Sequence, residues 1–383
     1  DLHLEIDAGM AIEGFECPTH DVAVQRHGRN RLSVALKKGK EVQRNRTSTH
    51  QPQVSQNTRG NIPNKDFVFR YQLAGHKLKT AIMQHADQQG KTFSLVLVPP
   101  AKLADVPPQQ RELIFVVDTS GSMSGLPMQH MKTTMRRCLK GLNANESFQI
   151  VAFSNDATSL GDRPIPATAA NVKKALDSLD ALQAGGGTRI LAGLEAALAM
   201  PQEPSTVRVI SFMTDGYVGN ETDVLRTIRQ NLGHGRIFSF GIGSSVNRYL
   251  SAAMAREGHG AAAYVLPHEG PGKTVDDFYR RMKHAPLTDI AIDWGSMQVS
   301  DVQPGRIRDL LVGRPVLVTG RYTGEPPDHI KVTGIAGGQS VSYRVALDGP
   351  RKEHEGIRYI WARQKIRQMA RANRHEPSKE LRQ

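Results

Sequence analysis

Three short segments of the chain carry small oxygen-bearing side chains at spacings that suit a hard metal ion. The first, Asp118-Thr-Ser120-Gly-Ser122, supplies one carboxylate and two hydroxyl groups from a single loop. A threonine, Thr188, follows a run of three glycines, and a third segment reads Thr214-Asp215-Gly216. Mg²⁺ prefers octahedral oxygen ligation and commonly takes one or two carboxylates, with water or ligand completing the shell. The three segments together therefore predict a divalent-cation site.

The elements around these segments would hold them in position. Residues 113–117, which follow Glu112, form an apolar run of strand length, rich in β-branched residues, which predicts a strand buried on both faces. A second such run, Val207–Met213, ends at Thr214. The glycine loop is expected to open a helix with Thr188 at its N-cap. Because open α/β sheets bind ligands at the carboxyl ends of their strands, the site is expected at that edge.

Strands and helices alternate over residues 112–285, which predicts an α/β fold with a doubly wound, mostly parallel sheet. Alternating apolar residues make the flanking regions, 1–98 and 286–349, β-rich, and we expect them to pack together around the inserted α/β domain. Residues 99–111 are expected to form a proline-bracketed linker, with a long exposed loop at 41–65. Residues 350–383 predict a basic helix and a polar tail.

The cation constellation resembles the metal-ion-dependent adhesion site of von Willebrand factor A domains. The resemblance implies a Rossmann-like sheet of strand order 3-2-1-4-5-6, with Asp118 and Asp215 on either side of its switch point. It implies Mg²⁺, or alternatively Mn²⁺ or Ca²⁺, as the ion, and no catalytic or organic-cofactor residues. The metal ligands that it implies are Asp118, Ser120, Ser122, Thr188 and Asp215.

Other segments resemble a more specific family. Residues 17–20, 64–75 and 93–100 are similar to the second half of the VIT domain of inter-alpha-trypsin inhibitor heavy chains. Residues 214–221 and 241–248 resemble the heavy-chain type of A domain, which bacterial VIT–VWA surface proteins of the sortase-target type share. The resemblance implies an extracellular or cell-surface location, in the envelope if the chain is bacterial. Because the VIT-like region starts partway through that module, we expect the sequence to be a fragment.

Composition narrows the class of partner. The 383 residues carry a formal net charge of +13, with basic residues concentrated at 26–46 and 351–374. Such a charge attracts acidic polymers, so an acidic polysaccharide is a candidate partner, although a solvated basic surface is the simpler interpretation. The absence of interleaved aromatic residues argues against specific nucleic-acid binding. No apolar run reaches membrane-spanning length, and Cys17 and Cys138 fit neither a zinc site nor a disulfide framework.

Three functions remain open on the sequence. The first and favoured one is non-enzymatic, cation-dependent binding, in which the metal captures a carboxylate of a protein or matrix partner. The second is a hydrolase with a metal-activated water, but no histidine or acidic residue adjoins the metal loop as an evident base. The third is a structural module whose cation only stiffens a loop.

The sequence also predicts how two of the helices pack against the rest of the chain. The basic helix at 358–372 is expected to dock on the flanking β region rather than to lie on a membrane. The helix at 274–283 has only a short apolar stripe, so few anchors are expected to hold it.

Overall fold

The computed structural model describes residues 2–37, 66–73, 78–99, 110–203, 206–216, 219–243, 245–265, 272–283, 287–347 and 354–372. The expected loop at 41–65, nearly all of the expected linker and the expected polar tail lie outside these ranges. Residues 38–46, 351–353 and 373–374 of the two basic regions also lie outside these ranges.

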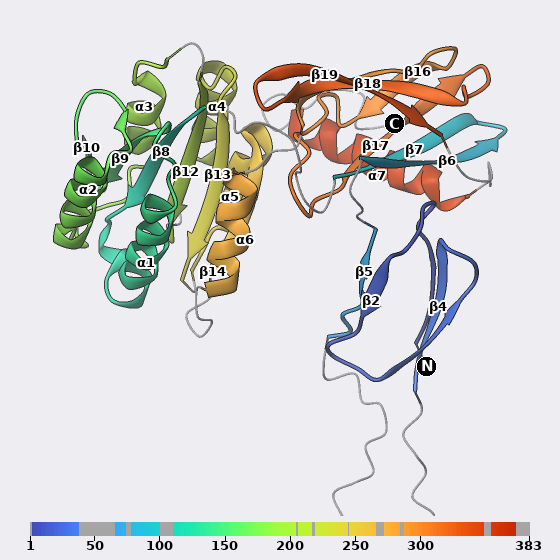
Figure 1. Cartoon of the computed structure of the whole chain (residues 1–383), viewed down its shortest axis with the longest axis horizontal. Coiled ribbons are helices and arrows are strands. Elements are labelled where there is room, and N and C mark those ends of the chain that lie inside the picture. Colours follow the sequence, from blue (N-terminus) through green and yellow to red (C-terminus); the bar gives the residue numbers. More distant parts are fainter. Residues whose placement is uncertain are drawn as a thin grey trace, which may run out of the picture.

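The described residues between 110 and 283 form the parallel-sheet unit, at the left of Figure 1. Its sheet has the order β10-β9-β8-β12-β13-β14, with the short β11 also paired to β9. The strands are β8 (Arg111–Asp118), β9 (Ser147–Phe153), β10 (Ala157–Ser159), β11 (Ile165–Pro166), β12 (Val207–Thr214), β13 (Arg236–Ile242) and β14 (His259–Val265). Numbered along the chain without β11, this order is 3-2-1-4-5-6, which confirms the predicted fold class.

Helices cover both faces of this sheet because the side chains of each strand alternate between two cores. Leu113, Phe115 and Val117 of β8 belong to one core, and Ile114 and Val116 belong to the other. The first core is covered by α1, α2 and α6, and the second by α3, α4 and α5. Their bounds are α1 (Leu126–Lys140), α2 (Ala169–Ala181), α3 (Ile190–Ala199), α4 (Glu221–Asn231), α5 (Arg248–Glu257) and α6 (Gly272–Lys283).

One expected helix boundary is wrong in a way that affects the site. Helix α3 begins at Ile190 with Arg189 at its N-cap, so Thr188 precedes the cap. The N-cap side chain makes no capping hydrogen bond. Thr188 therefore belongs to the loop and is free to direct its hydroxyl away from the helix terminus.

Strands from both flanks of the parallel-sheet unit share one sheet in a second, two-sheet unit. This sheet has the order β16-β17-β7-β6, and β7 pairs with β17 from Lys91–Tyr322 to Leu97–Val316. A three-stranded sheet, β15-β18-β19, packs on it around Phe93, Leu95 and Val332. The strands are β6 (Lys79–Asp87), β7 (Gly90–Val98), β15 (Thr288–Asp293), β16 (Gln298–Gln303), β17 (Val316–Thr323), β18 (His329–Ala336) and β19 (Gln339–Ala346).

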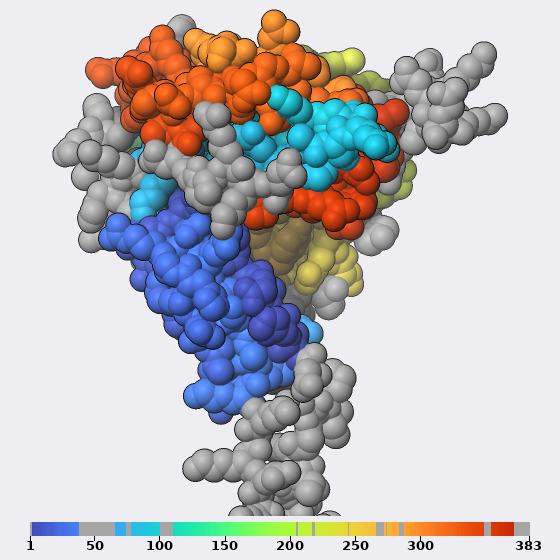
Figure 2. Space-filling model, turned by 90° about the vertical axis from the view of Figure 1, so that its right-hand side faces the viewer, coloured from blue at the N-terminus to red at the C-terminus, as the bar shows by residue number. Residues whose placement is uncertain are grey.

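Residues 2–37 and 66–73 form a small N-terminal unit that projects from the two-sheet unit (Figure 2). Its sheets are β1-β4-β3 and β2-β5, around a core that includes Leu32 and Val34. The strands are β1 (His3–Asp7), β2 (Gly14–Glu16), β3 (Val22–Arg26), β4 (Arg31–Leu36) and β5 (Arg70–Gln72). Glu13 reaches the two-sheet unit by an ion pair of 2.8 Å with Lys79.

The carboxyl-terminal helix α7 (Gly356–Ala372) docks on the four-stranded sheet. The Trp361 indole N–H donates to the carbonyl of Asp301 at 3.1 Å, and Thr319 donates to the Gln364 carboxamide at 3.3 Å. Docking on the β region is therefore what the structure shows. None of the helices in the described part of the chain has both the length and the apolarity needed to cross a membrane.

An ionic cluster joins the parallel-sheet unit to the two-sheet unit. Arg236, at the start of β13, donates through Nε to Asp309 and through Nη2 to Asp289 at 3.1 Å. Arg236 and Asp309 are 5% and 6% exposed, so this interaction is removed from water. Leu311, from the same segment as Asp309, packs into a core of the parallel-sheet unit.

We expect the free energy of unfolding to fall between pH 6.5 and about 4 because of His259, beside this cluster. Burial lowers the pKa of His259 to about 4, helped by the positive charges of Arg306, Arg236 and Arg308 and opposed by Asp289. Within that window the unfolded chain binds a proton that the folded chain does not, so acid favours unfolding.

Urea unfolding of the wild type and of His259→Asn at pH 7 and pH 4.5 measures this effect. Asparagine tolerates the left-handed backbone of this residue, which has φ 57°. The variant should lose less stability on acidification than the wild type. The same loss in both proteins would contradict the assignment to His259.

Candidate metal centre

Strand β8 delivers Asp118 to the carboxyl edge of the parallel sheet, where a tight turn follows. The backbone N–H of Ser120 donates to Asp118 Oδ1 at 2.8 Å, which fixes the carboxylate. The turn continues into a short 3₁₀ helix at Gly121–Met123. Asp118 is fully buried, whereas Ser122 lies at the surface. The loop thus runs from the sheet interior to solvent.

The neighbouring strand β12 places Thr214 and Asp215 against this loop. Thr214 Oγ1 donates to Asp118 Oδ2 at 2.5 Å, and Ser122 Oγ donates to Asp215 Oδ1 at 2.8 Å. The hydroxyl oxygens of Ser120 and Ser122 are 3.2 Å apart. Since β8 and β12 are adjacent parallel strands, the contacts arise from their shared carboxyl edge. The structure therefore brings Asp118, Ser120, Ser122 and Asp215 together.

The hydrogen-bond directions leave lone pairs available in this cluster. Because Ser122 gives its only hydroxyl hydrogen to Asp215, Ser120 must be the donor in the Ser120–Ser122 pair. Both hydroxyl hydrogens are then used within the cluster. Lone pairs on the serine and carboxylate oxygens remain to bind a cation.

Two buried carboxylates so close together need a counter-charge. Burial raises the pKa of Asp118, opposed by hydrogen bonds from Ser120 and Thr214, and the charge of Asp215 adds to the rise. Burial likewise raises the pKa of Asp215, against the hydrogen bond from Ser122. A divalent cation would remove this penalty by supplying positive charge at the site.

Thr188 lies next to the cluster on the glycine loop and is half-buried. A Cβ atom on Gly216 would lie 2.8 Å from Thr188 Cγ2 and 3.4 Å from Asp118 Oδ2. Glycine at position 216 therefore lets the loop approach the two strands closely. The structure places Thr188 beside the carboxylates, although its hydroxyl makes no hydrogen bond among the described residues.

Two supporting residues were missed by the sequence analysis. Thr214 was noted only as part of a segment, yet its hydroxyl holds Asp118 and accepts from the N–H of Gly216 at 2.8 Å. Asn155 accepts from the N–H of Gly187 at 2.8 Å and so anchors the glycine loop. The position of Thr214 at the end of a buried strand could have indicated its role beside Asp118. The sequence contains no such indication for Asn155, because its contact with Gly187 forms only in the folded loop.

The donor set fits a hard, oxygen-preferring ion. Among the described residues, no group of three or more His, Cys, Asp or Glu side chains is arranged to hold a metal. The cluster instead offers two carboxylates and neutral hydroxyls, a combination that suits Mg²⁺ with water in the remaining positions. Asp118 and Asp215 would supply the charge, and the serines with Thr188 would supply neutral oxygens.

Comparisons with known proteins identify the surrounding domain. Residues 111–264 match the von Willebrand factor type A domain family. The chain is 26% identical to mouse inter-alpha-trypsin inhibitor heavy chain 4 over 349 residues, which cover 87% of this chain and 36% of that protein. It is also 26% identical to a von Willebrand factor A domain-containing protein of Dictyostelium discoideum over 240 residues, or 62% of this chain and 26% of that protein.

A solved structure shares the fold. The von Willebrand factor type A structure from Catenulispora acidiphila superposes with a TM-score of 0.53 at 15% identity, covering 72% of this chain and 74% of that one. The chain spans only about a quarter to a third of the two curated relatives. Residues 111–264 are thus a von Willebrand factor type A domain, within a chain distantly similar over most of its length to inter-alpha-trypsin inhibitor heavy chains.

Proposed function

We propose that this chain is a non-enzymatic binding protein that captures a carboxylate of a protein or matrix partner through a divalent cation. The metal would be held by Asp118, Ser120, Ser122, Thr188 and Asp215, with Mg²⁺ as the first candidate and Mn²⁺ or Ca²⁺ as alternatives. The observation that carries the proposal is the hydrogen-bonded cluster of two carboxylates and two serines at the carboxyl edge of β8 and β12.

Exposure on one side of the cluster supports an external ligand. Gly121, Ser122 and Ser124 are exposed, whereas Asp118 and Asp215 lie behind them in the fold. A cation held by two carboxylates and neutral oxygens keeps positions for water, which an incoming carboxylate can replace. The partner would therefore approach from the side of the serine loop.

The environment of the serines favours binding over hydrolysis. Ser120 donates to Ser122, and Ser122 donates to Asp215, so no histidine or lysine accepts either hydroxyl hydrogen. The one carboxylate that Ser122 faces would be engaged by the proposed cation, which leaves it a poor general base for a serine nucleophile. A hydrolase with a metal-activated water remains the alternative function, and a purely structural cation remains the third.

Water relaxation by bound Mn²⁺ distinguishes partner capture from a structural cation. With Mn²⁺ loaded, titration with N-acetylaspartate amide should lower the water proton relaxation rate, because the probe carboxylate displaces water from the ion. N-acetylasparagine amide, which has the same shape without the charge, should have no such effect. If both probes leave the relaxation rate unchanged, the cation only stiffens the loop.

An extracellular or cell-surface setting belongs to the same proposal. Its support is the similarity to inter-alpha-trypsin inhibitor heavy chains, together with the net charge of +13. That charge also favours acidic polysaccharide as an additional, less specific partner.

A further inference from the structure

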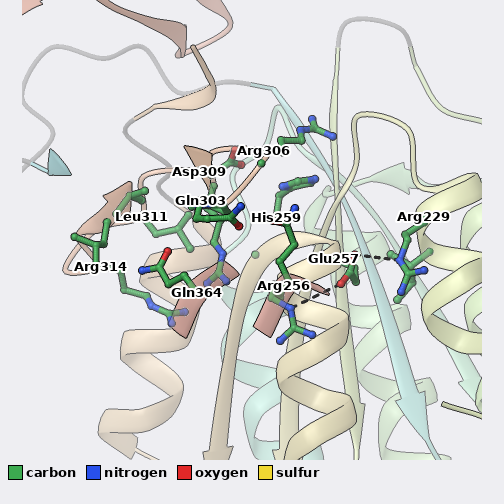
Figure 3. Close-up of a pocket in the computed structure, with 18 of the residues that line it drawn as sticks. Arg229, Arg256, Glu257, His259, Gln303, Arg306, Asp309, Leu311, Arg314 and Gln364 are labelled. Carbon is green, nitrogen blue, oxygen red and sulfur yellow. Dashed lines mark hydrogen bonds and ion pairs between the residues drawn. The ribbon is translucent and has the colours of Figure 1, made fainter. Parts of the chain in front are cut away.

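A cavity of about 780 Å³ lies between the parallel-sheet unit and the two-sheet unit (Figure 3). One wall comes from the ends of α4 and α5 and the start of β14. The other comes from the segment between β16 and β17 and from α7. Clefts of this volume at domain boundaries commonly bind small ligands.

The cavity lies at the opposite edge of the parallel sheet from the metal centre. His259 begins β14, and the neighbouring Arg236 begins β13, so this is the amino edge of both strands. Asp118 and the Thr214–Asp215 segment mark the carboxyl edge. A ligand in the cavity would therefore not touch the proposed cation.

Arginine dominates the charged lining of the cavity. The six arginines on its walls are Arg229, Arg256, Arg306, Arg308, Arg314 and Arg367. Among the described residues, the acidic side chains that line it are those of Glu257 and Asp309. Glu257 pairs with Arg229 at 3.2 Å, and Asp309 pairs with Arg236. Both lining carboxylates are thus already engaged, and the cavity keeps an excess of positive charge.

Arg314 and Arg367 both line the cavity, and neither forms an ion pair with a carboxylate among the described residues. Arg314 comes from the segment before β17 and Arg367 from α7, so the two are held by different elements. Both residues are exposed to solvent, so an anion that enters the cavity can reach their guanidinium groups.

Neutral hydrogen-bonding groups accompany the arginines. Gln303 lines the cavity and is 4% exposed. Its carboxamide offers both a donor and an acceptor to a ligand in the cavity. Gln364 accepts from Thr319, which leaves its amide hydrogens available on the cavity side.

His259 lies on the cavity wall close to several of these arginines. Burial, followed by the positive charges of Arg306 and Arg236, lowers the pKa of its imidazole to about 4. The arginine charges around His259 have the sign that attracts an anion.

We propose that this cavity binds a small polyanion of disaccharide size that carries several sulfate or phosphate groups on a hydroxylated ring. Arginine forks match sulfate and phosphate oxygens, while Gln303 and Gln364 suit ring hydroxyls. Because its walls belong to two units, the bound ligand would also bridge them.

Isothermal titration calorimetry with two probes tests the site. Sucrose octasulfate and inositol hexakisphosphate are each titrated into the whole chain in metal-free buffer at low salt. Saturable binding at one site per chain is expected for at least one of them. Binding of both probes shows that the shared oxyanion chemistry suffices, and binding of one identifies the preferred ester.

Charge-neutral variants localise the binding. Arg314→Gln and Arg367→Gln should each weaken binding about tenfold, since each removes a charged hydrogen-bond donor. Lys174→Gln, an equal charge change on the exposed surface of α2, should change the affinity less than about twofold. Asp118→Asn should bind the probes as the wild type does.

Two results would overturn the proposal. One is the lack of saturable binding by either probe. The other is an equal loss of probe affinity in Lys174→Gln and in the two cavity variants. The binding would then come from general attraction of the probes to a basic protein.

Discussion

Replacing Asp118 with asparagine is expected to lower the affinity for Mg²⁺ and Mn²⁺ by about a hundredfold or more. The substitution preserves the shape of the side chain and its acceptor for the N–H of Ser120. It removes one of the two carboxylates that face the proposed ion, and with it much of the electrostatic attraction.

Calorimetric titration of Mg²⁺ and Mn²⁺ into both proteins measures this loss. Asp177→Asn is the matched control, because it removes one carboxylate from the exposed surface of α2. The control should keep the wild-type affinity. Circular dichroism and thermal unfolding must show that Asp118→Asn is folded. Equal affinities in a folded Asp118→Asn protein and the wild type would exclude Asp118 as a ligand.

Thr188 can be tested in the same titration by a pair of substitutions. Thr188→Val keeps the shape and removes the hydroxyl, so the metal affinity should fall about tenfold. Thr188→Ser keeps the hydroxyl and should retain most of the affinity. If valine and serine behave alike, the contribution of Thr188 is packing beside Gly216 rather than ligation.

The second large effect is expected from Arg236→Ala, which should destabilise the protein by about 3–5 kcal/mol. Arg236 is the shared partner of Asp309 and Asp289 across the boundary between the two units. Burial already raises the pKa of Asp309 against the opposing charge of Arg236. Without the guanidinium, the buried Asp309 carboxylate has to become protonated or move into water.

Denaturant unfolding measures this change, and two further variants interpret it. Arg306→Ala removes a solvent-exposed partner of Asp289 and should cost no more than about 1 kcal/mol. The double variant Arg236→Met, Asp309→Leu replaces the buried pair with apolar side chains and should regain most of the stability. If the double variant is as unstable as Arg236→Ala, the loss of stability comes from the changed packing at this position rather than from an unpaired buried charge.

The fold of the α/β domain could be predicted because local sequence patterns encode it directly. The apolar run before Asp118 has no polar interruption, which only a strand covered on both faces tolerates. The grouping of Asp118 with Thr214 and Asp215 could be predicted in the same way, since both segments follow such a strand. Where the parallel strands end, their side chains necessarily share an edge.

Features that depend on contacts distant in sequence could not be predicted. Residues 1–98 are divided between two units, and β7 pairs with β17, which follows the A domain in the sequence. No local sequence pattern indicates this division. Helix α6 was expected to have few anchors, but Arg111 donates to the Met282 carbonyl at 2.9 Å and Tyr279 donates to that of Gly141. Neither contact is visible in the short apolar stripe of the helix.

The insertion of the A domain between strands of one sheet has a mechanical consequence. The chain leaves the two-sheet unit after β7 and returns to it at β15. The pairing of β7 with β17 joins the chain segments before and after the A domain in one sheet. Tension applied to the chain before and after the A domain would be carried by the hydrogen bonds between β7 and β17 and by the contact of Arg358 in α7 with Asp87 in β6. The A domain, lying outside this load path, would keep the loop that carries Ser120 and Ser122 undistorted until that sheet separates.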